Sequence, residues 1–120
     1  KNFSILYGDE GPRLAPLYDL LATVAYPDLS PKFAMKIGKR ATLAELDAKG
    51  WAAFAADVGI GLPLMRRRVA EISKGVLEKA TAVAEELARP ELDRTAIEQF
   101  ANMIRDRADR CALTIAGAMR

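Results

Sequence analysis

The chain has 120 residues, of which 51% are hydrophobic and 28% charged, and its formal net charge is +2. This length suits one compact domain with its own core. The near-neutral charge disfavours direct nucleic-acid binding, which usually needs a strong basic excess on one face. No apolar run approaches the ~18 residues that a membrane span needs, and the N-terminus lacks a signal-peptide pattern. We therefore expect a cytoplasmic protein without a membrane partner.

Two residue types narrow the chemistry further. The chain has no histidine, which excludes Ser-His-Asp and Cys-His nucleophile systems as well as histidine-ligated zinc or iron. Its single cysteine, Cys111, excludes an internal disulfide and fits a reducing cytoplasm.

The first residues predict a β-hairpin that carries an amide and a carboxylate at its two ends. Apolar residues alternate along residues 3–7, residues 8–12 (Gly-Asp-Glu-Gly-Pro) supply turn chemistry, and residues 13–15 can return as a second strand. Asn2 stands just before the first strand, and Asp19 follows the second. The hairpin is therefore expected to hold these two side chains rigidly.

Asp19 has two interpretations. An Asp before Leu-Leu-Ala is commonly the N-cap or a first-turn carboxylate of a helix, here 19–25. Alternatively, Asn2 and Asp19 are paired ligands of Mg²⁺, a hard cation that takes carboxylate and amide oxygens and keeps several waters, so that two protein ligands plus phosphates suffice. Taken alone, the Asp favours the helix cap, and the order of the whole segment, KNFS, turn and LAPLYD, favours the metal site.

Residues 32–38 predict a short strand or extended segment with one buried face. Phe33, Met35 and Ile37 alternate with polar or small neighbours, which is the period of a half-buried strand. Lys36 on the other face is a candidate for contact with the phosphates of a nucleotide, although an exposed lysine at a strand edge explains it better.

The rest of the chain predicts three main helices, at 48–58, 63–88 and 96–118. Thr42 and Thr95 each open a capping box, with Glu three residues later. Asp47 offers a second cap for the first helix, and Gly59 is placed to end it. Each helix has an apolar stripe at helical spacing. The charged residues at 105–107, 109–110 and 66–68 lie away from the stripe centres or flank them, as a solvated face does. The bulky stripe residues are expected to share one core, which consists of Trp51, Phe54, Ile72, Val76, Phe100 and Ile104.

Two short segments resemble a known family. The letters KNFS at residues 1–4, followed after the turn by LAPLYD at 14–19, resemble the C-terminal part of the HipA family of bacterial serine/threonine kinases, and AMKIG at 34–38 resembles the same family. The resemblance implies that Asn2 ends the catalytic loop and that Asp19 plays the part of the D-F-G aspartate, both as Mg²⁺ ligands. It also implies that the catalytic base Asp lies upstream of Lys1, so no catalytic residue is expected within the chain.

The resemblance further implies a mainly α fold, the C-terminal helical subdomain of a kinase-like protein with a short N-terminal β-hairpin. Residues 1–40 would form the catalytic-segment hairpin and extended stretch, and residues 41–120 the helical bundle. The implied ligands are Mg²⁺ and ATP, and the implied partners are the missing N-terminal kinase lobe, a protein substrate and a HipB-like antitoxin. The isolated chain would be inactive and would bind neither ligand tightly.

A second hypothesis belongs to another class of protein. The helices from residue 47 onward would also fit a stand-alone helical interaction module without catalysis. The hairpin discriminates between the two, because such a module has no reason to place Asn2 and Asp19 at the ends of one hairpin.

Overall fold

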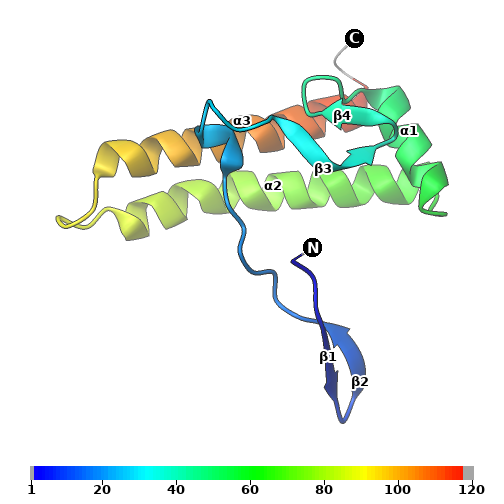
Figure 1. Cartoon of the computed structure of the whole chain (residues 1–120), viewed down its shortest axis with the longest axis horizontal. Helices are drawn as coiled ribbons and strands as arrows, with labels where there is room; N and C mark the ends of the chain where they lie inside the picture. Colours follow the sequence, from blue (N-terminus) through cyan, green and yellow to red (C-terminus); the bar gives the residue numbers. More distant parts are fainter. Residues whose placement is uncertain (1, 118–120) are drawn as a thin grey trace.

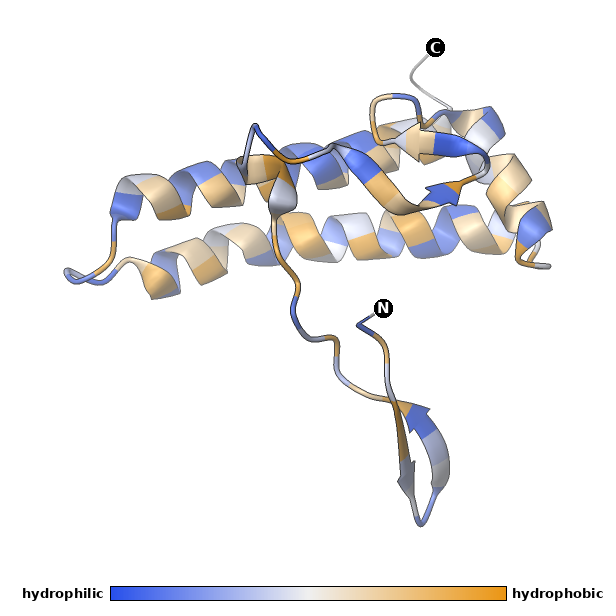
Figure 2. Cartoon of the chain, viewed as in Figure 1, coloured by the Kyte–Doolittle hydropathy of each residue, from blue (hydrophilic) through white to orange (hydrophobic). Residues whose placement is uncertain are grey.

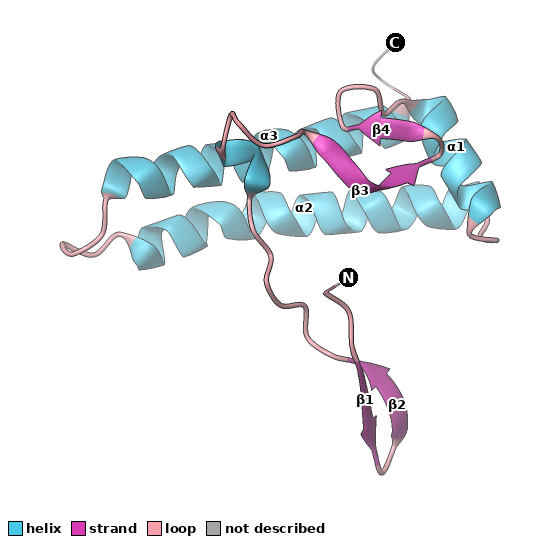
Figure 3. Cartoon of the chain, viewed as in Figure 1, coloured by secondary structure: helices cyan, strands magenta, loops and turns pink. Residues whose placement is uncertain are grey.

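The computed structural model describes residues 2–117, and the fold of this range is mainly α (Figures 1 and 3). Two short hairpins precede three α-helices. In chain order the elements are β1 (Ile5–Gly8), β2 (Gly11–Leu14), the 3₁₀-helix η1 (Thr23–Ala25), β3 (Lys32–Ile37), β4 (Arg40–Thr42), α1 (Ala48–Asp57), α2 (Leu62–Leu87) and α3 (Arg94–Ala116). Helices α2 and α3 form a long antiparallel pair, and α1 lies across one end of it.

Helix α1 has the boundaries that its sequence signals indicate. The Asp47 carboxylate accepts a hydrogen bond from the Gly50 backbone N–H at 2.7 Å, which satisfies one of the free donors of the first turn. At the other end Gly59 has a φ of 71°. The backbone N–H of Ile60 reaches back to the Ala55 carbonyl, as in a Schellman motif.

The capping boxes predicted at Thr42 and Thr95 do not begin helices. Thr42 ends β4, and its hydroxyl accepts from the Glu45 N–H across a turn before α1. Helix α3 begins at Arg94 because the carboxylate of Asp93 accepts from the N–H groups of Thr95 and Ala96. Asp competes well with Thr for the N-cap position, so the predicted start was wrong by two residues.

A second hairpin, β3–β4, holds the extended segment against α1. Its tight turn is Gly38-Lys39, whose φ angles of 50° and 67° are both positive, as a type I′ turn requires. Gly38 lies directly against the backbone of Gly50 in α1. The strand pairing is irregular between Lys32 and Ile37. The predicted buried face is therefore incomplete, since Met35 lies in the irregular stretch and is 76% exposed.

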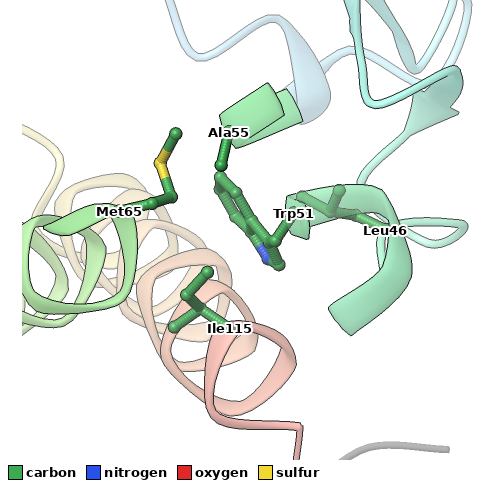
Figure 4. Packing of buried hydrophobic residues seen from close by; sticks show 5 residues of the cluster. All are labelled: Leu46, Trp51, Ala55, Met65 and Ile115. Carbon is green, nitrogen blue, oxygen red and sulfur yellow. The ribbon is translucent and has the colours of Figure 1, made fainter. Parts of the chain in front are cut away.

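The hydrophobic core lies where α1 meets the start of α2 and the end of α3 (Figure 4). Inside it, the Trp51 indole N–H donates to the Thr114 hydroxyl at 3.0 Å, and Thr114 is only 1% exposed. The buried members are Leu46, Trp51, Ala55, Met65 and Ile115, with Phe54 among the partly buried residues that pack on them.

The predicted single core was wrong for four of its six members. Ile72 is 66% exposed, Phe100 38% and Ile104 41%, and the half-buried Val76 lies outside the core, whereas Trp51 and Phe54 do belong to it. The reason is length. At 1.5 Å per residue the 10-residue helix α1 spans only about 15 Å and the 26-residue α2 about 39 Å, so α1 covers one end of the pair and leaves the other open.

Candidate functional site

The first hairpin brings Asn2 and Asp19 into contact. Strands β1 and β2 pair from Ile5 opposite Leu14 to the turn. The pairing continues outward through a hydrogen bond from the Ala15 N–H to the Ser4 carbonyl. At the open end of this hairpin, the Asn2 side-chain amide donates to both the backbone carbonyl and the carboxylate of Asp19, each at 3.2 Å. The contact thus joins two side chains that are seventeen residues apart in the sequence.

A further contact supports the same arrangement. The hydroxyls of Ser4 and Tyr18 share a hydrogen bond of 2.9 Å, two residues after Asn2 and one residue before Asp19. The two chain segments that leave the hairpin are thus tied by side chains at two successive levels. This fixes where the Asp19 carboxylate stands relative to the Asn2 amide.

Asp19 itself has an unusual backbone conformation. Its φ is 53°, in the left-handed region, which costs an L-residue roughly 1–2 kcal/mol and which Asp and Asn tolerate best. Such strain persists where the surroundings enforce it, and it concentrates at functional sites. Asp19 does not cap a helix: residues 20–22 have no helical structure, and the short helix that follows begins at Thr23 with Ala22 as its N-cap.

The two side chains carry the kinds of oxygen that Mg²⁺ takes, a carboxylate and an amide carbonyl. In the structure the amide nitrogen of Asn2, not its oxygen, faces the Asp19 carboxylate, at the 3.2 Å of an ordinary hydrogen bond. A half-turn of the Asn2 amide would exchange its nitrogen for its oxygen at the same place. No cluster of three or more acidic or cysteine side chains suited to a metal occurs in residues 2–117, so phosphates and water would have to complete such a site.

A cavity of about 540 Å³ opens beside Asp19, between residues 19–24 and the helices α2 and α3. Its walls are mostly apolar, with Ser73 and Arg107 as polar groups from the two helices. Sequence reasoning missed Arg107, which it assigned to a solvated helix face. The signal was present, because Arg107 is one turn beyond Ile104, another residue of the same cavity.

Lys36 is not brought to this site. It lies exposed in β3, and none of the hydrogen bonds or ion pairs of the described residues joins it to Asn2 or Asp19. It also does not line the cavity beside Asp19. Among the other basic residues, Arg67 and Arg68 pair with Glu71 on the exposed surface of α2, in agreement with a solvated face.

Arg110 has a structural task instead. Its guanidinium donates to the backbone carbonyls of Leu43 and Ala44, at 3.0 and 2.8 Å, and so ties the connection between β4 and α1 to α3. Arg40 adds a second tie by pairing with Asp47 at 3.0 Å. Hydrogen bonds from the Arg40 guanidinium and from the Gly50 N–H hold the pKa of the Asp47 carboxyl below its usual range.

Comparison with known proteins places the chain in a family. A protein named "Putative kinase Y4mE" from Sinorhizobium fredii (strain NBRC 101917 / NGR234) is 54% identical over 115 residues, which are 96% of this chain and 27% of that protein. The chain therefore spans about a quarter of the length of this relative. No solved structure matches the chain. No helix in the described range is both long and apolar enough to cross a membrane. The model of the HipA-like C-terminal domain matches residues 1–84, the part that holds both hairpins, α1 and most of α2, and the chain belongs to this family.

Proposed function

We propose that this chain is the C-terminal part of a serine/threonine protein kinase in which Asn2 and Asp19 hold the Mg²⁺ of Mg-ATP. The observation that supports it best is the contact between the two side chains at 3.2 Å, with Asp19 held in a left-handed backbone conformation. A helix cap would need neither feature. Family membership and the kinase name of the relative point to the same chemistry.

Each residue of the pair would have its own task. The Asp19 carboxylate supplies the negative charge that binds the cation, and the Asn2 amide, once turned, offers its neutral oxygen as the second ligand. Asn2 and Asp19 would hold Mg²⁺ there, and the ion would supply positive charge that offsets the negative charge developing on the transferred phosphoryl group. The hairpin keeps both ligands in place before the nucleotide arrives, and such positioning is the main contribution a protein makes to phosphoryl transfer.

The remaining parts of the enzyme would lie outside these 120 residues. A kinase also needs a catalytic base, a lysine on the phosphates and a lid over the nucleotide. We propose that the N-terminal lobe of the parent protein supplies them, with the base upstream of Lys1. Lys36 stays a candidate for nucleotide contact only if that lobe brings the phosphates to β3. The proposed acceptor is a protein hydroxyl, the proposed setting is a cytoplasmic toxin with a HipB-like antitoxin, and the isolated chain would be inactive.

The test is kinase turnover of the full-length parent with Asp19→Asn. Removal of one preorganised group that stabilises charge at a reacting centre typically costs at least about 100-fold in turnover, whereas an exposed Asp without a catalytic role can be replaced by Asn with little effect. We expect a loss of that size with an unchanged melting temperature. Asp9→Asn, at the turn of the same hairpin, is the matched control and should keep wild-type turnover. Wild-type turnover in Asp19→Asn would contradict the proposal that Asp19 is a metal ligand.

A second candidate function is a helical interaction module. It is favoured by the apolar side chains that α2 and α3 leave exposed, such as Ile72 in α2 and Ile104 in α3. The two functions separate in the same assay: a pure interaction module shows no phosphate transfer even in the intact parent.

A further inference from the structure

The open end of the helix pair carries a long apolar groove between α2 and α3. Its volume is about 600 Å³, and α2 lines it from Ile72 to Leu87, a distance of roughly 22 Å at 1.5 Å per residue. From α3, Phe100 and Ile104 form the opposite wall. Figure 2 shows hydrophobic residues recurring along both helices. We call this surface, bounded by these residues, the α2–α3 groove.

We infer that the α2–α3 groove seats a single apolar α-helix that the parent polypeptide supplies from outside these 120 residues. The inference rests on family membership and on the groove itself, and it holds whether or not the parent transfers phosphate. It states where the exposed apolar faces of α2 and α3 are covered in the parent protein, and that the covering element is a helix.

The chemistry of the groove selects a helix. Its lining is almost entirely apolar, and Lys79 is the one charged side chain among the residues that form it. A strand or loop lying there would bury backbone N–H and carbonyl groups without partners, which costs about 1–3 kcal/mol for each. A helix satisfies its own backbone and needs only apolar contact. The groove between two packed helices is also where a third helix normally sits.

Gly75 gives an independent indication of a close neighbour. It lies in the middle of α2, where glycine costs about 1 kcal/mol relative to alanine. A Cβ at this position would meet nothing within 4 Å, so no contact among the described residues accounts for the glycine. It lines the α2–α3 groove. A helix backbone that approaches closely at this point would account for it.

The source of the helix follows from the lengths of the proteins and from the position of the groove. Nearly three quarters of the Sinorhizobium relative lies outside the part that matches this chain, although that part covers almost the whole chain. The groove is also continuous with the cavity beside Asp19, because Ile72, Val76 and Ile104 line both. Asp19, which Asn2 contacts, lines that cavity, so the groove extends to the end of the N-terminal hairpin. The same polypeptide is therefore the nearest supplier.

Cysteine protection in the full-length parent tests the inference. In a Cys111→Ala background, Ile104→Cys reports on the groove, and Leu113→Cys is the matched control, because both residues lie on α3 with similar exposure, 41% and 47%, and Leu113 is outside the groove. We expect a maleimide to label Ile104→Cys at least about tenfold more slowly than Leu113→Cys in the native parent, and equally fast in urea. Equal rates in the native parent would overturn the inference.

Photocrosslinking then identifies the occupant. Benzophenone-maleimide attached at Ile104→Cys, and separately at Val83→Cys, is expected to crosslink one segment of the parent, at positions three, four or seven residues apart. Crosslinks scattered over several loops would contradict a single helix. Crosslinks to a second copy of the chain, with labelling that slows as protein concentration rises, would assign the groove to self-association and overturn the inference as well.

Discussion

Gly38→Ala is the substitution that best tests how the second hairpin is held. An added Cβ at Gly38 would stand 1.8 Å from the Gly50 carbonyl oxygen, far inside contact distance, and the obstructing atom is backbone in α1. The φ of Gly38 is also 50°, which disfavours any residue with a Cβ. The substitution therefore forces the hairpin away from α1 or opens the turn.

The two costs can be summed approximately. The left-handed conformation costs an alanine roughly 1–2 kcal/mol, and overpacking that displaces backbone costs roughly 1–3 kcal/mol. We expect a loss of about 2–5 kcal/mol in the free energy of unfolding, measured by urea denaturation of the 120-residue chain followed through Trp51 fluorescence. This is a large share of the 5–15 kcal/mol typical of a domain.

Gly75→Ala is the matched control, and its expected sign is opposite. Gly75 has open space around its Cβ position and lies within a helix, so alanine should stabilise the chain by about 1 kcal/mol. If Gly38→Ala changed the free energy of unfolding by less than about 0.5 kcal/mol, the packing of β3–β4 on α1 would be wrong.

Two further predictions concern the core and its edge. Trp51→Phe should lower the free energy of unfolding by about 1–3 kcal/mol, because it removes both volume and the indole hydrogen bond to Thr114; equal stability in a urea titration would place the indole outside the core. The bonds from Arg40 and the Gly50 N–H lower the folded pKa of Asp47, so their stabilisation is present above the unfolded pKa of about 3.9 and is lost as the pH falls through the folded value. Asp47→Asn should therefore be less stable at pH 7 and should lose less stability between pH 5 and pH 2, and parallel pH profiles of the two proteins would contradict this.

The sequence predicted helix positions and the first hairpin well because both depend on local chemistry. Asp47 and Gly59 set the ends of α1 through hydrogen bonds to residues at most five positions away. The alternation and turn residues near the N-terminus likewise indicate β1 and β2. The sequence also selected Asn2 and Asp19, although the family resemblance contributed to that choice, and their role as metal ligands stays a prediction.

Only the tertiary structure decided which apolar faces are covered. The stripe of α2 reads the same along its whole length, yet Met65 is buried and Ile72 is exposed, because α1 reaches only the first turns. Similarly, nothing in the sequence indicates that Gly38 and Gly50 touch. They are in contact because the type I′ turn packs against α1. Periodicity shows that a face is apolar, but the partner of that face depends on the lengths and crossing of elements far apart in the chain.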